Sequence, residues 1–283
     1  MSAFAHSSFK AASYLAARPT YPDKLFSYIA SYNRQHNASK QSKTASLDIG
    51  CGPGEATVPV TKFIDTVTGI DPSPVMIEVA SEKYKDIANL TFMQGSDKNF
   101  ADKFPDKSLD LVTVAQAVHW FEFPTFFHNA HKILKPNGTL AFWGYVDHIF
   151  VGHPKASQIS LDYFYGDDHM GPFWEQPGRN LLRDMLVVAQ PPTTIFKDIR
   201  RIINDSPVPD PQAVLEISQT LKLAGVLEYM KTASAYHTWK KNNPDKRDAC
   251  EECIDEIKKA EGWNDETEVT IKWATVLCLA TAV

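Results

Sequence analysis

The sequence LDIGCGPG at residues 47–54 decides the expected fold. An apolar run, Ala45 to Ile49, enters a turn in which every second residue is glycine, and a helix is expected from Ala56. Glycine adopts positive φ at low cost and lets a ligand approach bare backbone. In an open α/β sheet, ligands bind beyond the carboxyl ends of the strands. Residues 47–54 therefore predict a strand–turn–helix unit that holds a small ligand.

The spacing of these glycines excludes two phosphate-binding loops. The dinucleotide fingerprint G-x-G-x-x-G would need its third glycine at Glu55, and a P-loop would need Lys-Ser or Lys-Thr after the turn. The pattern here is G-x-G-x-G, with Asp48 two residues before the first glycine. Neither of the two loops is therefore expected.

The pattern around this turn is one of short apolar runs that alternate with helical stretches. A helix is expected first, over residues 22–34. The expected strands are 45–49, 67–70, 90–94, 109–115 and 139–145, and the expected helices between them are 56–63, 74–84, 100–104 and 123–134. Alternation at this interval is typical of a doubly wound, mostly parallel α/β sheet.

The second half is less regular. Helices are expected over 213–227, 228–241 and 249–260, and two late strands over 194–203 and 268–280, the last one antiparallel. Residues 148–178 have no clear pattern. We therefore expect a seven-stranded sheet with a helical cap. The chain is expected to form one domain, 1–283, with an N-terminal helical lid (1–44), a ligand-binding core (45–146) and a substrate cap with the sheet-completing strands (147–283).

Three further groups of residues follow predicted strands. Asp71 ends the second strand, where it can accept hydrogen bonds from both hydroxyls of a ribose, or else cap a turn or helix. Ser96 and Asp97 follow the third strand and can contact an adenine amino group, or else act as caps. His119 and Trp120 follow the fourth strand beside the first, which favours a place at the ligand site over packing alone.

Composition narrows the class of protein. Lysine and arginine number 29 against 34 aspartate and glutamate, so the broad basic surface of a nucleic-acid-binding protein is not expected. Four cysteines fit a reducing compartment, and Cys250 and Cys253 lack a second pair of metal ligands, so no metal site is expected. Apolar stretches are too short to span a bilayer. We expect a cytoplasmic protein that binds a small molecule and neither nucleic acid nor membrane; its oligomeric state is open.

Taken together, these motifs resemble the class I S-adenosylmethionine-dependent methyltransferases. The resemblance covers residues 45–145, where DIGCGPG, GID, QGSD, LDLVTVAQAVHW and LKPNGTLAF occur in order. Three further features are similar to a fungal branch that contains trans-aconitate methyltransferases and their cantharidin-resistance relatives. They are Tyr14 with residues 18–22, residues 116–120 and residues 231–237, in which Ala233 replaces a tryptophan common in that branch.

The resemblance implies the fold of that family, a Rossmann-like sheet, with S-adenosyl-L-methionine as cofactor. It places the methionine part beside the glycine turn, the ribose on Asp71, and the adenine between Pro72 and the pair Ser96 and Asp97. An N-terminal segment would close over the cofactor, with Arg18 near its carboxylate. The implied cofactor-binding residues are Tyr14, Arg18, Asp48, Gly50, Cys51, Gly52, Gly54, Asp71, Pro72, Ser96, Asp97, Gln116 and Ala117.

The reaction expected from this resemblance is methyl transfer to a small acceptor bordered by His119 and Trp120. A carboxylate acceptor, such as trans-aconitate, needs no general base because it is ionised at neutral pH. A hydroxyl or activated carbon would need one, and His119 is the candidate. Two alternatives remain open: carbon methylation of a larger apolar acceptor of the quinone or sterol type, and a catalytically silent cofactor-binding module.

Overall fold

The computed structural model describes residues 18–36 and 43–283. Tyr14, which the resemblance implicates in cofactor binding, lies outside the described residues. The expected N-terminal lid (1–44) is therefore described only in part, and its helix is α2 (Asp23–His36).

A single mixed sheet runs through the described chain. Its strands are β1 (Ala45–Ile49), β2 (Thr66–Asp71), β3 (Leu90–Gln94), β4 (Leu109–Ala115), β5 (Leu134–Phe150), β6 (Phe196–Asn204), β7 (Ile217–Lys222) and β8 (Glu268–Ala282). The order is β3-β2-β1-β4-β5-β8-β6, and β7 also pairs with β8. The first five strands are parallel, and β8 is antiparallel to its three neighbours. The predicted α/β fold is confirmed, but the sheet has eight strands and not seven, because β6 and β7 both pair with β8.

Helices cover both faces of this sheet. They are α2, α3 (Pro74–Lys83), α4 (Phe123–Ile133), α5 (Pro154–Tyr165), α6 (Gly178–Arg183), α7 (Leu223–Met230), α8 (Ser234–Asn242) and α9 (Ala249–Glu261). Successive side chains of a strand point to opposite faces. Accordingly, Trp143 of β5 joins the core cluster that contains Ile29 of α2, whereas its neighbour Phe142 joins the cluster that contains Phe127 of α4.

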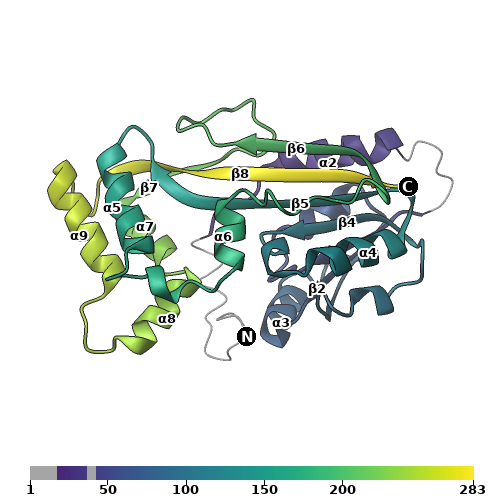
Figure 1. The fold of residues 1–283 in the computed structure, drawn as a ribbon, viewed down its shortest axis with the longest axis horizontal. Coiled ribbons are helices and arrows are strands. Elements are labelled where there is room, and N and C mark those ends of the chain that lie inside the picture. The colour runs from purple at the N-terminus through teal and green to yellow at the C-terminus, as the bar shows by residue number, and fades with distance from the viewer. Residues whose placement is uncertain (1–17, 37–42) are drawn as a thin grey trace.

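The cap is built on strand extensions. β5 pairs with β4 only as far as Trp143 and then continues beside β8 to Phe150. Figure 1 shows α5, α7, α8 and α9 gathered around this extended end of β5 and β8, away from α3, β2 and α4. The helix α6 lies between the two groups, in front of β5. The residues that follow β4 therefore lie where the shorter strands end, and they face the cap.

Four predicted helices are wrong in part, and the shortest of them, 100–104, is a 3₁₀ turn, Phe100–Asp102. Residues 217–222, inside the predicted helix 213–227, form β7 because β8 offers them an unpaired edge, and Thr220 and Thr270 exchange a side-chain hydrogen bond of 2.8 Å across that pair. The predicted helix 228–241 breaks between α7 and α8. The predicted helix 56–63 is reduced to a 3₁₀ turn, Val58–Lys62. The unassigned stretch 148–178 contains α5.

Within residues 18–36 and 43–283, no helix has the length and apolarity needed to cross a bilayer. The same residues contain no group of three or more metal-binding side chains. All four cysteines are buried free thiols.

Candidate functional site

The glycine turn after β1 is shaped by three residues with positive φ. Gly50, Gly52 and Gly54 have φ of 72°, 53° and 94°. The N–H of Gly50 donates to the carbonyl of Ile70 at 2.8 Å, which ties the turn to the neighbouring strand β2. A Cβ on Gly50 would lie 2.6 Å from the Cβ of Ala117, so the turn runs directly against the residues that follow β4.

Asp71, at the end of β2, holds the same turn. Its Oδ2 accepts the N–H of Gly52 and its Oδ1 accepts the N–H of Ser73, each at 2.9 Å. Burial raises the pKa of this carboxyl group, and the two N–H donors act in the opposite direction. Each oxygen keeps lone pairs for a ligand, because a carboxylate has about four acceptor sites.

A cavity of about 550 Å³ opens in front of the turn. The residues predicted for cofactor binding that line it are Arg18, Gly50, Cys51, Gly52, Asp71, Pro72, Ser96, Asp97, Gln116 and Ala117. Trp120 and Tyr145 also line it. The structure therefore brings together side chains and backbone from the ends of β1, β2, β3 and β4.

Two of the predicted residues, Asp48 and Gly54, are not in the cavity lining. Asp48 is buried and accepts hydrogen bonds from the hydroxyls of Thr57 (2.6 Å) and Thr113 (2.9 Å). Burial raises its pKa to about 6. Gly54 lies where a Cβ would be 2.8 Å from the ring of Phe92. Asp48 therefore supports the turn through its hydrogen bonds, and Gly54 lets the turn pass close to Phe92.

Gln116 shapes the other wall of the cavity. It has φ of 53°, a conformation that costs a non-glycine residue about 1–3 kcal/mol. Its side-chain amide donates to the carbonyl of Tyr145 and accepts the N–H of Tyr145, both at 2.8 Å. These two hydrogen bonds offset the strain and fix the end of β4 to β5 at the point where the cap begins.

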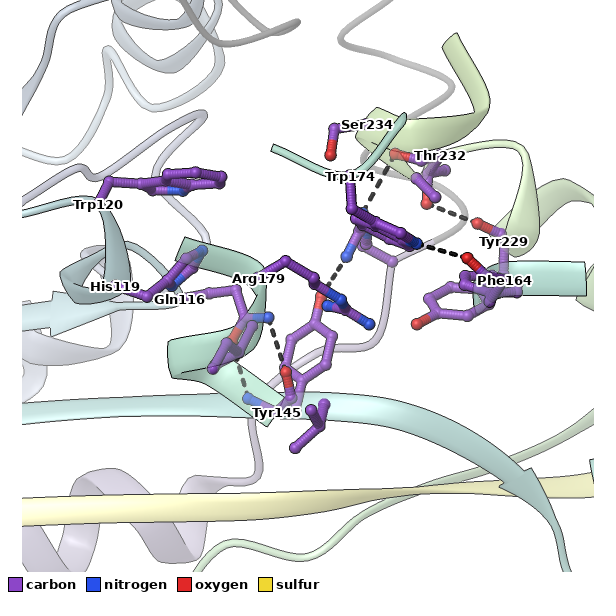
Figure 2. Close-up of a pocket in the computed structure, with 14 residues that line it drawn as sticks. Gln116, His119, Trp120, Tyr145, Phe164, Trp174, Arg179, Tyr229, Thr232 and Ser234 are labelled. Atoms are coloured by element: carbon purple, nitrogen blue, oxygen red, sulfur yellow. Dashed lines mark hydrogen bonds between the residues drawn. The ribbon is translucent and has the colours of Figure 1, made fainter. Parts of the chain in front are cut away.

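A second, smaller cavity of about 80 Å³ adjoins the first. Arg18, Gln116, Trp120 and Tyr145 line both cavities, and His119 lines only the smaller one. We call this smaller cavity the cap pocket, because residues 145–146 and further residues from 164 to 234 close it. Figure 2 shows its side chains, with His119 and Trp120 on one side and Tyr229 and Thr232 on the other.

His119 is buried in the cap pocket without a hydrogen-bond partner for its Nδ1 among the described residues. Burial, together with the charge of Arg179, lowers the pKa of His119 to about 3, so its imidazole is neutral at pH 7. The His119 ring lies 4.6 Å from the Trp120 ring, centroid to centroid. Both residues line the cap pocket, and their contact with a ligand stays a prediction.

Sequence reasoning missed Arg179 and did not single out Tyr145. Arg179 lies on α6, after a stretch with no clear pattern, and enters the cap pocket only because α6 packs in front of β5. Trp174, inside the stretch 148–178 that has no clear pattern, also lines the pocket. So do residues 232–234, within the segment 231–237 that resembles the fungal branch.

The buried histidines predict how stability changes with pH. Burial lowers the pKa of His148 to about 4 and, as described, that of His119 to about 3. Histidine in the unfolded chain has a pKa of about 6.5, so below that pH the unfolded chain binds more protons. The free energy of unfolding is therefore expected to fall as the pH drops from about 6.5 to about 4, by up to about 1.4 kcal/mol per pH unit for each histidine.

Asp48 offsets part of this loss, because its raised pKa makes the folded chain take up a proton near pH 6. Urea unfolding at pH 7, 6 and 5 measures how the free energy of unfolding changes with pH. In a His119→Asn variant, stability should fall less steeply with decreasing pH than in the wild type. Equal slopes in the two proteins would show that His119 does not resist protonation in the folded state.

Comparison with known proteins agrees with this geometry. Residues 47–142 match the family model of the methyltransferase domain. The Saccharomyces cerevisiae protein named "Probable S-adenosylmethionine-dependent methyltransferase CRG1" is 29% identical over 290 residues, which cover 96% of this chain and 95% of that protein. The methyltransferase pgmE of Aspergillus terreus is 30% identical over 151 residues, 52% of this chain and 43% of that protein.

The fold is also that of a solved structure, a candidate type II methyltransferase from Anaeromyxobacter dehalogenans. The two share 20% identity with a TM-score of 0.69, over 93% of this chain and 97% of the other. The family match spans the strands that build the large cavity, and the relative from yeast extends over nearly the whole chain. These similarities indicate an S-adenosylmethionine-dependent methyltransferase, with a methyltransferase domain at residues 47–142 and S-adenosylmethionine as its cofactor.

Proposed function

We propose that this enzyme methylates a carboxylate oxygen of a small anionic metabolite, such as trans-aconitate or an acid of similar size. One observation carries the proposal. The cap pocket contains two arginines, Arg18 and Arg179, and none of the described residues that line it is acidic. Positive charge without a balancing acid in the lining favours an anionic ligand.

The large cavity fits the cofactor. Its position beyond the carboxyl ends of parallel strands is the usual ligand site of such a sheet. In this proposal the turn at Gly50 and Gly52 lies under the methionine part, Asp71 accepts hydrogen bonds from the ribose, and Ser96 and Asp97 contact the adenine edge. Arg18 lies near the carboxylate of the cofactor, with Pro72 beside the adenine and Cys51, Gln116, Ala117 and Tyr14 as further contacts. Asp48 and Gly54 act by supporting the turn.

When bound, S-adenosylmethionine would supply an activated methyl group: the acceptor oxygen would form a bond to the methyl carbon as the carbon–sulfur bond of the sulfonium breaks, which would leave a neutral thioether. An ionised carboxylate loses no proton in this reaction, so the protein has only to align it and exclude water. His119, with a pKa near 3, is a weak base. We assign it a positioning role, with Trp120 beside it.

The size and chemistry of the cap pocket argue against a quinone or sterol acceptor. A cavity of about 80 Å³ lined by two arginines suits a compact charged molecule better than a long apolar one. The proposal includes a single domain in which residues 147–283 form the acceptor cap, acting on small-molecule metabolites in the cytoplasm. The four free thiols are compatible with that location.

A His119→Asn variant tests the chemistry. With a carboxylate acceptor, the variant should keep its rate within about tenfold of the wild type, and kcat should be flat between pH 6 and 8 in both proteins. An acceptor that needs a general base would lose roughly 10²-fold or more in the variant. His131→Asn serves as the control, because His131 lies on α4 and lines neither cavity. Loss of rate in the His119 variant, restored as the pH rises, would contradict the carboxylate proposal.

A further inference from the structure

Two arginines line the cap pocket, and they differ in whether they also line the large cavity. Arg18 lines the large cavity as well, and its guanidinium donates to the hydroxyl of Tyr145 at 3.0 Å and to the carbonyl of Thr232 at 3.1 Å. Arg179 lines only the cap pocket. A ligand contact made by Arg179 would therefore concern the acceptor and not the cofactor.

Arg179 is held in a fixed orientation. Its Nε donates to the hydroxyl of Tyr165 at 2.7 Å, and its Nη2 donates to the same hydroxyl and to Oδ1 of Asp147. The guanidinium lies 4.1 Å from the centroid of the Trp174 ring, and Figure 2 shows the two side chains next to each other in the pocket. A planar fork fixed in this way loses little conformational entropy when it binds a carboxylate.

The charge around Arg179 is not cancelled. Asp147 accepts from two arginines, Arg179 through Oδ1 and Arg183 through Oδ2, the latter at 3.1 Å. Two positive charges therefore share one negative charge. The side chain of Arg179 is only 12% exposed, whereas that of Arg183 is 41% exposed, so water screens Arg183 more. The excess positive charge therefore acts mainly toward the cap pocket.

The buried Nδ1 of His119 is the second observation that points to a ligand. His119 is 93% buried, since only 7% of its surface is exposed, and Nδ1 has no hydrogen-bond partner in the described chain. Leaving a buried polar atom unpaired costs about 1–3 kcal/mol. A bound acceptor can supply the missing partner, since a neutral imidazole with its proton on Nδ1 donates to an oxygen.

We propose that Arg179 determines the acceptor specificity of the enzyme by binding an anionic group of the acceptor, with His119 Nδ1 as a second contact to the same molecule. This inference rests on the proposed function for the chemistry of the acceptor. It goes further in naming the residue that distinguishes charged from uncharged molecules. Asp147, Tyr165 and Trp174 position that residue.

The test compares Arg179→Met with Arg183→Met. Methionine keeps an unbranched side chain against Trp174 while removing the charge, and Arg183→Met removes the other partner of Asp147 without changing the pocket lining. Arg179→Met should raise KM for the acceptor about 10- to 100-fold with a smaller change in kcat. Arg183→Met should change KM less than about threefold. The KM of Arg179→Lys should lie between those of the two methionine variants.

Binding measured without turnover separates this inference from the proposed function. Protein loaded with S-adenosylhomocysteine is titrated with trans-aconitate and other di- and tricarboxylic acids, and with their uncharged methyl esters. The wild type should prefer an acid over its ester, and Arg179→Met should lose that preference while it keeps wild-type affinity for S-adenosylhomocysteine, which also shows that it is folded.

Different results would overturn the role of Arg179 and the carboxylate chemistry. Equal acid affinity in Arg179→Met and Arg183→Met, or no acid binding to the wild type, overturns the role of Arg179, whatever the product is. A methyl group found on carbon, with the Arg179-dependent acid preference intact, overturns the carboxylate chemistry and leaves the selection of an anionic acceptor supported.

Discussion

Replacing Gly50 by alanine should greatly weaken the binding of S-adenosylhomocysteine. Gly50 has φ of 72°, which costs an alanine about 1 kcal/mol, and the added Cβ would lie 2.6 Å from the Cβ of Ala117. Neither atom is the end of a flexible side chain, so the turn after β1 or the turn after β4 must move. Both turns line the large cavity. We expect affinity, measured by calorimetry, to fall at least about 100-fold, equivalent to about 2.7 kcal/mol.

Gly152→Ala is the matched control. Gly152 has φ of 78°, so it bears the same backbone cost, but a Cβ there meets nothing within 4 Å and the residue lines neither cavity. This variant should lose stability of about 1 kcal/mol and bind the ligand as the wild type does. Similar affinities for the two variants would mean that the close approach of residues 50 and 117 does not shape the cofactor site.

Replacing Asp71 by alanine should weaken S-adenosylhomocysteine about 10- to 100-fold or more. The variant loses the acceptor proposed for the ribose hydroxyls and also the acceptor for the N–H groups of Gly52 and Ser73. A hydrogen bond to a charged group contributes about 1.5–3 kcal/mol. Asp71→Asn keeps one oxygen acceptor, so its affinity for S-adenosylhomocysteine should lie between those of Asp71→Ala and the wild type.

Asp65, which lies just before the first residue of β2, provides a control. Its carboxylate also accepts a backbone N–H, that of Thr44 at 2.8 Å, but Asp65 lines neither cavity. Asp65→Ala should leave the affinity for S-adenosylhomocysteine unchanged. Unchanged affinity in Asp71→Ala would refute the assignment of Asp71 to the ribose.

The part of the site that could be predicted from the sequence is the part built by local signals. The glycine turn, Asp71, and the residues after β3 and β4 each follow a short apolar run, and parallel strands bring their carboxyl ends to one edge. Asp48 was placed among the cofactor contacts by resemblance. Strand alternation puts it on the face opposite Leu47 and Ile49, and there it accepts from Thr57 and Thr113.

The parts that could not be predicted depend on partners far along the chain. β7 has apolar residues at a spacing compatible with a helix, and only its pairing with β8, about 50 residues later, makes it a strand. Arg179 lies 63 residues after Gln116, directly after a stretch without periodicity, and becomes a pocket residue through its contacts with Asp147 and Tyr165. Local sequence carries no signal for such contacts.

The position of the transferred methyl group tests carboxylate methylation directly. The enzyme is incubated with methyl-labelled S-adenosylmethionine and a panel of small carboxylic acids that includes trans-aconitate, and the labelled product is isolated and treated with alkali. A methyl ester releases its label as methanol and regenerates the acid, which is the result that we expect. Label that stays on the product after alkali, or label found only on a quinone or sterol acceptor, would contradict methylation of a carboxylate oxygen.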